Sequence, residues 1–527
     1  MDCKPCNNAS VHGFSSFPRF FSADFWSEST QPVARGYYRP LILLSYAIDY
    51  SLWGLRPAGF HLTNILWHAL ASALVVVLVL RIISSPTAAL LSGALFAVHP
   101  VHVESVTFVS GRTDVIATVF ALISFILFVD ERCEERITWR LPVSVLFFVL
   151  ALLSKEVAAA LPALLLAAEM VFGSRGAART NEFAPKPNRD PRPGTAKGFP
   201  PAGLKIIVIH GIYWGVLGLY LWTRFGALGI SPKLEGRLTG REVLLTMPGV
   251  LLDYMRLLIA PIALCADYVV NLQRDVSLAN IASLAVALVG CGAIGYLILQ
   301  RKISGLLAAW VLTGLLPALQ IVPISVLKAE RFLYFPSVGF CALAGFLGAC
   351  AAGKPAKHES GAGGHGRALL RIFAFILIIL ALSFRTFTRN NVWKDEFTLY
   401  KATASCAPDN FRVQYNLGNA YFRKGDIENA IAHTETAFRL RPDFPQVSYN
   451  LGLMYATVGR VKEAEIMYRR AIDLDPAYAR AHNNLAVILY ADGRIEEARS
   501  EWSKALVLDH ALEQAREGLR LIEKVRK

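Results

Sequence analysis

The first 390 residues consist largely of apolar runs separated by short polar turns. A helix of ~20 apolar residues crosses the ~30 Å hydrocarbon layer of a membrane and satisfies its own backbone hydrogen bonds. The pattern therefore predicts a multispan membrane domain at residues 62–388 with about ten helices. These helices are expected at 62–83, 87–98, 114–130, 139–154, 156–173, 205–224, 278–299, 304–322, 333–352 and 368–388.

One further run, residues 245–263, departs from this pattern. It contains two prolines and the charged residues Asp253 and Arg256. Charges in the middle of a bilayer are costly, so this run is expected to form a re-entrant or surface helix.

After residue 390 the sequence becomes polar and repeats itself. The period is 34 residues, which is the difference between positions 416 and 450 and between 450 and 484. Small residues early and midway in each unit and a proline late in it are typical of the tetratricopeptide helix–turn–helix repeat. The recurring positions include Asn416, Asn450 and Asn484; Pro408, Pro442 and Pro476; Gly425, Gly459 and Gly493; and Ala430, Ala464 and Ala498.

These repeats set the predicted domain organisation. Three full units occupy residues 411–510. Residues 391–410 are expected to form a half-repeat linker, and residues 511–527 a helix that caps the open end of the solenoid. The predicted fold class is all-α, with a polytopic helical membrane domain followed by a tetratricopeptide-repeat α-solenoid.

The distribution of charge predicts the orientation of the helices. The 527 residues are 54% hydrophobic and 18% charged, with a net charge of +14. Much of this excess lies in short loops at 174–204, 301–302 and 354–371, and loops rich in Lys and Arg face the cytoplasm. Cations divided among such loops argue against a nucleic-acid partner. Counting from these loops, the segments expected outside are the N-terminal segment 1–61, the loops 99–113, 225–277 and 323–332, and the repeats.

The eight cysteines are scattered, and several lie inside apolar runs. The sequence therefore predicts no disulfide framework. Cys3 and Cys6 form an isolated CxxC, for which chance spacing is favoured over a zinc or redox site.

The densest polar cluster of the membrane half runs from His99 to Asp114. His99, His102 and Glu104 carry metal-ligand side chains, but their HxxHxE spacing is not a recognised zinc motif. If residues 101–112 form one surface helix, Glu104 and His102 lie on different faces of it. Ionisable residues that line a membrane cavity are functional candidates, and the alternative is an interfacial helix with solvated polar residues.

Cations on the predicted outer face form a second group of candidates. Such cations suit an anionic lipid head, because Lys and Arg donate hydrogen bonds to phosphate and neutralise its charge. The alternative, which the pattern alone favours, is interfacial anchoring by Arg and Tyr. The residues concerned are Arg39, Lys155 with Glu156, and Lys328, Arg331 and Tyr334.

A series of short motifs runs in order through both halves of the chain. The motifs are Tyr38-Arg39-Pro40, Trp53-Gly54, His61-Leu-Thr-Asn64, Phe96-Ala-Val-His-Pro-Val-His-Val-Glu104, Gly111-Arg112-Thr-Asp114, Ser154-Lys-Glu156, Glu330-Arg-Phe-Leu-Tyr334 and Trp393-Lys-Asp-Glu. In combination with the repeats, this series resembles the transmembrane and tetratricopeptide-repeat containing O-mannosyltransferases and their bacterial relatives, over about residues 20–510.

The resemblance implies a C-type glycosyltransferase fold. Such enzymes use a polyprenyl-phosphate-linked sugar, here expected to be mannose or a similar hexose, on the outer face of the membrane, while the repeats present a protein acceptor. An acidic residue of the first outward loop acts as base, and second-loop residues and a basic group hold the lipid phosphate. The implied catalytic candidates are Glu104, Asp114 and Asp24, the implied phosphate-binding residues are Arg39, Arg112, Lys328 and Arg331, and the other pocket residues are His99, His102, Lys155, Glu156 and Tyr334.

The N-terminal end departs from the family pattern. Family members begin with a membrane span followed by an acidic Asp-Asp-like motif, and this sequence starts beyond both. The topology count likewise expects a further span before the outward segment 1–61. Asp24 matches a later part of the first loop, which leaves Glu104 as the best remaining carboxylate.

The three repeated asparagines, Asn416, Asn450 and Asn484, are expected along one line of the concave face of the solenoid. An asparagine amide both donates and accepts hydrogen bonds, so this column could hold an extended peptide. A similar ladder is found in O-linked N-acetylglucosamine transferase. The competing interpretation is that asparagine is common at this position in tetratricopeptide repeats, and protein binding by the groove is expected either way.

The sequence thus predicts a membrane glycosyltransferase with a polyprenyl-phosphate sugar as donor and a protein acceptor, and it leaves a divalent metal open. The alternative is a catalytically inactive, membrane-anchored scaffold for envelope complexes. The expected location is a bacterial inner membrane with periplasmic repeats, or the endoplasmic reticulum membrane in a eukaryote.

Overall fold

The computed structural model describes residues 17–22, 25, 36–134, 136–173, 202–230, 238–320, 324, 326–352 and 362–526. Cys3, Cys6, Asp24 and most of the linker 174–204 lie outside this part of the chain. Every regular element among the described residues is a helix. The predicted all-α class, a helical membrane domain followed by a tetratricopeptide-repeat solenoid, is confirmed.

The chain divides into two compact units. The membrane unit comprises residues 1–264 and 270–391, and the repeat unit comprises residues 265–269 and 392–527. The short segment 265–269 therefore belongs to the repeat unit, although it lies far from the repeats in the sequence.

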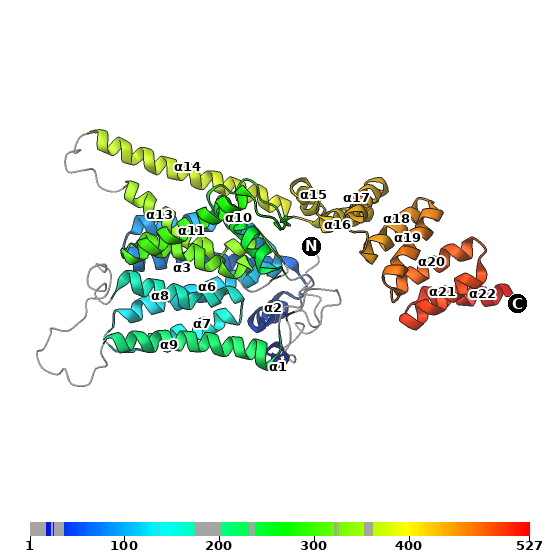
Figure 1. The fold of residues 1–527 in the computed structure, drawn as a ribbon, viewed down its shortest axis with the longest axis horizontal. Helices are drawn as coiled ribbons and strands as arrows, with labels where there is room; N and C mark the ends of the chain where they lie inside the picture. The colour runs from blue at the N-terminus through cyan, green and yellow to red at the C-terminus, as the bar shows by residue number, and fades with distance from the viewer. Residues whose placement is uncertain are drawn as a thin grey trace, which may run out of the picture. The chain divides into compact units, whose positions relative to one another are not determined.

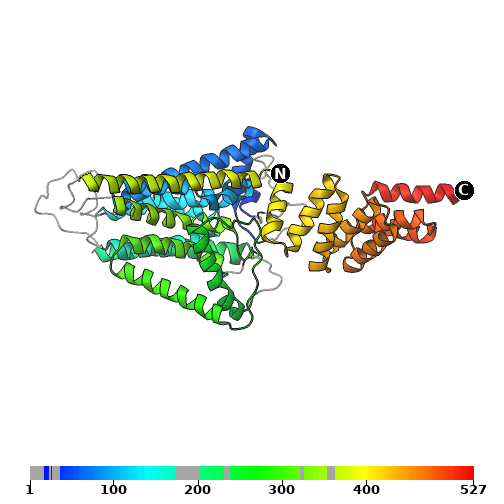
Figure 2. The same cartoon turned by 90° about the horizontal axis from the view of Figure 1, so that it is seen from above.

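The long helices of the membrane unit run side by side in both views (Figures 1 and 2). Its core lies between α3, α4, α6, α8, α12 and α13, each of which contributes buried apolar side chains. The helices are α1 Phe17–Phe20, α2 Pro40–Trp53, α3 Pro57–Ile83, α4 Pro86–Val98, α5 Val103–Thr107, α6 Arg112–Arg132, α7 Arg140–Leu152, α8 Leu161–Phe172, α9 Ala202–Leu221, α10 Gly240–Ile259, α11 Leu278–Leu299, α12 Ile303–Leu315, α13 Pro336–Ala352 and α14 Ala362–Val392.

Each of the ten predicted spans coincides with a helix. By length and composition, five helices of the described chain are able to cross a membrane, or six if the bent pair Pro86–Val98 and Pro100–Thr107 is one span. The helices α7, α12 and α13 are apolar but shorter. The run 245–263 corresponds to α10, which is not among the candidate spans.

Two segments of the membrane unit have a local structure that the sequence left open. The expected outward segment 1–61 contains the helix α2, which begins directly after Arg39. The polar loop 101–112 is not one helix but a chain of three short turns, η3 Pro100–His102, α5 Val103–Thr107 and η4 Val109–Gly111. Proline has no backbone N–H to donate, which explains why a new turn starts at Pro100.

The repeat unit contains three helix pairs flanked by two single helices. Its first two pairs pack through Gly418 and Gly452, where an added Cβ would meet Thr434 and Tyr468 of the partner helix. The helices are α15 Glu396–Cys406, α16 Phe411–Arg423, α17 Ile427–Leu440, α18 Pro445–Thr457, α19 Val461–Leu474, α20 Ala479–Ala491, α21 Ile495–Leu508 and α22 Glu513–Arg526.

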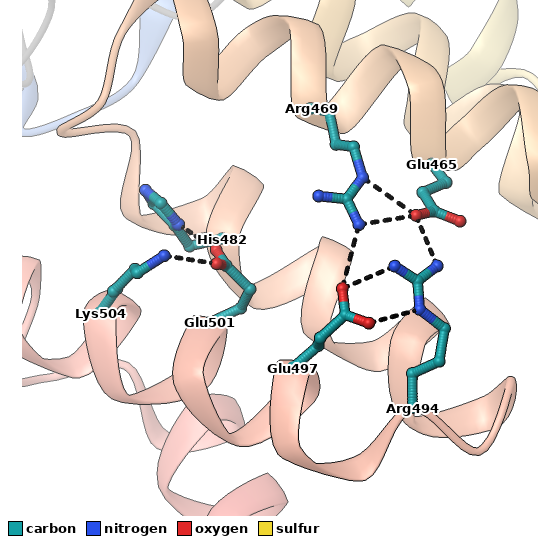
Figure 3. A network of polar contacts seen from close by, with 7 residues as sticks. All are labelled: Glu465, Arg469, His482, Arg494, Glu497, Glu501 and Lys504. Carbon is teal, nitrogen blue, oxygen red and sulfur yellow. Dashed lines mark hydrogen bonds and ion pairs between the residues drawn. The ribbon is translucent and has the colours of Figure 1, made fainter.

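An ion-pair network joins successive repeats (Figure 3). Glu465 on α19 accepts hydrogen bonds from Arg469 and from Arg494, which precedes α21, and Glu497 on α21 accepts from the same two arginines. Each exposed pair contributes little alone, and a network of four residues contributes more because the side chains restrict one another. A separate contact joins His482 and Glu501 of the third repeat, at 2.5 Å.

The structure corrects the prediction about cysteines. A disulfide joins Cys265 to Cys406, and Cys406 is the last residue of α15. A neighbouring ion pair, Arg412 Nη2 to Asp267 Oδ1 at 3.2 Å, holds the same segment 265–269 to the first repeat helix. Spacing in the sequence gave no sign of this bond, because its two cysteines are 141 residues apart.

This disulfide gives the first testable prediction. Without reductant, the purified protein should resist alkylation at Cys265 and Cys406, and after mild reduction both thiols should react with a maleimide. Mass spectrometry of tryptic peptides would check this, and Cys133, which is exposed and free, serves as the positive control for labelling. Equal labelling of Cys406 before and after reduction would show that the bond does not form.

Candidate functional site

The predicted site residues lie on short segments between the helices of the membrane unit. Arg39 directly precedes α2, and Glu104 lies on the five-residue helix α5. Lys155 and Glu156 lie between α7 and α8, at the start of the turn η5 Glu156–Ala160. Arg331 lies on the turn η9 Glu330–Leu333. Segments this short are held by contacts with their surroundings.

Glu104 and Arg331 form the first ion pair. Glu104 Oε2 accepts a hydrogen bond from the backbone N–H of Arg331 at 2.9 Å, and Oε1 accepts one from its guanidinium group. The side chain of Glu104 is 2% exposed, whereas that of Arg331 is 28% exposed. The carboxylate is therefore enclosed, and the cation retains a face open to a ligand.

Asp114 and Lys155 form a second pair, in which both side chains are buried. Burial lowers the pKa of Lys155, and the charge of Asp114 acts in the opposite direction. The Lys155 Nζ atom lies 5.5 Å from the ring centroid of Phe332, and the Arg331 guanidinium carbon lies 5.3 Å from the same centroid. The cations of the two pairs thus lie near the same aromatic ring.

Glu156 is shared between two arginines. Its Oε2 lies 3.0 Å from Arg39 Nη2, and its Oε1 lies 3.2 Å from Arg224 Nη2. Burial alone would raise the pKa of this carboxyl group, but the charges of Arg39 and Arg224 outweigh burial and lower the pKa to about 2. The carboxylate is therefore charged at any physiological pH.

These three groups form one electrostatic cluster. The charge of Asp114 acts on both Arg39 and Arg331, and the cations Arg39 and Arg331 both act on Lys155. Four cations against three carboxylates leave a surplus of one positive charge. The members of this ion-pair cluster are Arg39, Lys155, Arg224 and Arg331 with Glu104, Asp114 and Glu156.

Arg112, which was predicted to bind the donor phosphate, is not a member of this cluster. Its side chain is fully buried and paired with Asp49, and its Nε donates to Asn64 Oδ1 at 2.7 Å. A further donor, Nη2, reaches the carbonyl oxygen of Phe60 at 3.0 Å. With these contacts Arg112 joins α2, α3 and α6, so it is a structural residue and not a free cation.

Lys328 also pairs with a residue outside this cluster. Its Nζ lies 2.6 Å from Oδ2 of Asp253 on α10. Tyr254, beside this aspartate, accepts a hydrogen bond at its hydroxyl from the backbone N–H of Ala329 at 3.2 Å. Lys328 therefore links its loop to α10.

The histidines are buried and hydrogen-bonded. His99 Nε2 lies 2.9 Å from the carbonyl oxygen of Leu258, and His102 lies 2.7 Å from the hydroxyl of Ser337. Tyr334 shares a 2.7 Å hydrogen bond with His68. The described residues contain no group of three or more His, Cys, Asp or Glu side chains able to hold a metal ion.

Sequence reasoning missed several of these partners. Arg224 and Asp49 were not predicted, and neither was Arg389, whose Nη2 lies 3.0 Å from Oε1 of Glu330. A signal existed for Arg224, because a lone arginine ends the predicted span 205–224 on its outward side. The sequence contained no such signal for Asp49, since its segment was not predicted to be a helix.

In the repeat unit, two of the three predicted peptide-binding asparagines donate to neighbours. Asn450 Nδ2 donates to Tyr415 at 2.9 Å and to Asn419 at 2.8 Å. Asn484 Nδ2 donates to Tyr449 at 3.2 Å. The same offset of 35 residues recurs, so each asparagine binds a tyrosine of the preceding repeat. These contacts give the asparagine positions a structural role between repeats.

Gly111 gives a second testable prediction. An added Cβ would lie 2.7 Å from the carbonyl oxygen of Ser105 and 2.8 Å from that of Glu104. Both obstacles are backbone atoms, so Gly111→Ala should displace α5 and cost about 1–3 kcal/mol of stability. Thermal unfolding in detergent would measure this. Gly249→Ala in α10, where an added Cβ meets no atom within 4 Å, should not destabilise; equal melting temperatures for the two variants would contradict the prediction.

Together, the fold and the cluster define a helical membrane protein that combines an ion-pair cluster between its helices with a tetratricopeptide-repeat solenoid. The tetratricopeptide repeat family model matches residues 415–479 and 458–515.

The curated relatives extend over both units. Protein O-mannosyl-transferase TMTC3 from Homo sapiens is 26% identical over 473 residues, which cover 83% of this chain and 48% of that protein. Protein O-mannosyl-transferase TMTC4 from Homo sapiens is 28% identical, covering 81% and 61%. Protein O-mannosyl-transferase Tmtc2 from Drosophila melanogaster is 43% identical over 121 residues, covering 23% and 13%.

These relatives confirm the predicted resemblance to the transmembrane and tetratricopeptide-repeat containing O-mannosyltransferases. The chain spans about half the length of the first curated relatives it matches. Among solved structures, it is similar to MamA, with 22% identity, a TM-score of 0.24, and coverage of 25% of this chain and 76% of that one.

Proposed function

We propose that the protein transfers a hexose, mannose in the first instance, from a polyprenyl-phosphate donor to a hydroxyl group of a protein acceptor. The observation that carries this proposal is the ion-pair cluster, which has one surplus positive charge and is built from the motifs that resemble the family's site. The names of the curated relatives, all protein O-mannosyl-transferases, support the same reaction class.

The charge of the cluster supports a lipid-linked donor. A polyprenyl-phosphate sugar is a phosphodiester with a single negative charge, which the surplus charge of the cluster would balance. Arg39 and Arg331 are the partly exposed cations of the cluster, whereas Lys155 and Arg224 are buried. Arg39 and Arg331 are therefore the proposed phosphate ligands, and arginine suits this role because its guanidinium group binds two phosphate oxygens at once.

The chemical step requires a base, a nucleophile and a leaving group. The oxygen of an acceptor Ser or Thr would attack the anomeric carbon, and the bond from that carbon to the phosphate oxygen would break. Polyprenyl phosphate would leave with the electron pair, stabilised by Arg39 and Arg331. The hydroxyl proton would pass to Glu104, which becomes available as a base when the phosphate replaces it at Arg331.

The disulfide supports an orientation with the site away from the cytosol. Structural disulfides persist in oxidising compartments and are rare in the cytosol. The bond would place the segment 265–269 and the repeats in the periplasm or the lumen of the endoplasmic reticulum, in agreement with the positive loops predicted to face the cytoplasm. A bacterial inner membrane is the proposed location.

The repeats would hold the acceptor. The column of Asn416, Asn450 and Asn484 remains the proposed contact with the acceptor backbone. Because the amide nitrogen of Asn450 already donates within the solenoid, its side-chain oxygen is the proposed contact atom.

The proposal is tested by reconstituting the purified protein in liposomes with radiolabelled mannosyl phosphoryl undecaprenol and an unfolded protein rich in Ser and Thr as acceptor. Label that is incorporated into the protein and then released from it by alkaline β-elimination supports O-linked transfer. A matched reaction with GDP-mannose alone should give none. Absence of transfer from any lipid-linked hexose, with binding of the acceptor retained, would favour the scaffold alternative.

A further inference from the structure

The last turns of α14 contact both segments that carry the Glu104–Arg331 pair. Arg389, a buried residue of α14, pairs with Glu330 through Nη2 and Oε1 at 3.0 Å. The next residue, Asn390, accepts a hydrogen bond at Oδ1 from the hydroxyl of Thr107 at 2.9 Å. Adjacent residues of one helix thus reach two separate segments of the membrane unit.

These contacts lie next to the two members of the pair. Glu330 directly precedes Arg331 on η9, and Thr107 ends the five-residue helix α5 that carries Glu104. Neither a single α-turn nor a four-residue 3-10 turn is stable alone, so tertiary contacts fix their positions. Arg389 therefore holds the turn η9, which carries Arg331. Asn390 holds the helix α5, which carries Glu104.

Two further contacts extend this arrangement by one turn. Thr386 donates from Oγ1 to the carbonyl oxygen of Val98 at 2.6 Å, at the end of α4. Arg385 Nη2 donates to the carbonyl oxygen of Ile262 at 2.6 Å. Four residues near the C-terminal end of α14 thus make polar contacts with other segments of the membrane unit.

We propose that Arg389 and Asn390 are positioning residues that set the distance between Glu104 and Arg331. The repeat unit begins directly after them, at Val392. The catalytic importance of this distance rests on the proposed function, whereas the positioning itself does not. An error of one ångström in such a constellation lowers a rate by about 100-fold.

Hydrogen exchange in nanodiscs tests the positioning without any assay of activity. Arg389→Gln removes the charge and should accelerate exchange in residues 330–334 by at least ~10-fold, because their local opening becomes easier. Asn390→Ala should accelerate exchange in residues 103–107 and leave 330–334 unchanged. The control Arg132→Gln breaks a comparable pair with Glu169 and should leave both segments unchanged.

Sugar transfer forms the second part of the test. Arg389→Gln should lower kcat/KM by at least ~10-fold, with Arg389→Lys retaining about a third of the wild-type value, because a cation restores the pair. Unchanged exchange in both segments, or equal acceleration in all three variants, would overturn the positioning role. No transfer by the wild-type protein, with the expected exchange pattern, would instead contradict the proposed function.

Discussion

Replacing Arg331 with alanine is expected to reduce sugar transfer by at least ~100-fold, the loss seen when one charge-stabilising donor is removed from an active site. Arg331 is the partly exposed cation beside the enclosed carboxylate Glu104. Its loss would remove a ligand of the leaving phosphate and leave Glu104 without its cation. Initial rates of label transfer from the lipid donor, at saturating acceptor, would measure the effect.

The design of this experiment separates charge from geometry. Arg331→Lys keeps the charge but loses the planar group that binds two oxygens, so an intermediate rate is expected. The matched control is Arg274→Ala, because Arg274 also pairs with a glutamate, Glu242, but is 78% exposed. If Arg331→Ala keeps more than half of the rate of this control, the assignment of Arg331 to the donor phosphate is wrong.

Replacing Glu156 with glutamine is expected to destabilise the membrane unit by about 3–5 kcal/mol, because it leaves two arginines without their counter-charge. Arg39 and Arg224 both pair with this carboxylate. The melting temperature of the purified protein would fall by several degrees. Glu134→Gln is the matched control, since Glu134 pairs with Arg140 and is 42% exposed. Equal melting temperatures in both variants would contradict the prediction.

The same carboxylate gives a dependence on pH. Its pKa is lowered in the folded protein, from 4.5 to about 2. A carboxyl group with a lowered pKa stabilises the folded state fully above its unfolded pKa, and this contribution declines as the pH falls towards the folded pKa. The wild-type protein should therefore lose stability relative to Glu156→Gln between pH 4.5 and 2. Parallel melting curves across that range would show that Glu156 is not held as a charged group.

The helical architecture was predictable because its signals are local. Apolar runs located each of the ten predicted helices, and the 34-residue period located the repeats. The helix α2 was missed because Asp49 and the aromatic residues around it obscure its apolar face, and the structure shows Asp49 paired with Arg112. A charge hidden by a partner in another helix has no signature in a single sequence.

The site residues stay a prediction, but the structure shows where their side chains lie. Glu104, Asp114, Lys155, Glu156 and Arg331 do lie close together. Arg112 carries the same charge as Arg331, and the difference between a buried structural arginine and a partly exposed one depends on neighbours far away in the sequence. The disulfide was missed for the same reason, since proximity across 141 residues depends on tertiary structure.

The bond between Cys265 and Cys406 also restricts how the polypeptide is threaded through the bilayer. The two sulfur atoms can meet only if the intervening chain returns to the leaflet from which it started, so it must traverse the lipid an even number of times. Between the two cysteines lie two candidate spans, α11 and the C-terminal part of α14, which satisfy this condition. A translocation error that skipped one of them would strand the two thiols on opposite faces, so oxidation would mark those molecules that had been inserted correctly.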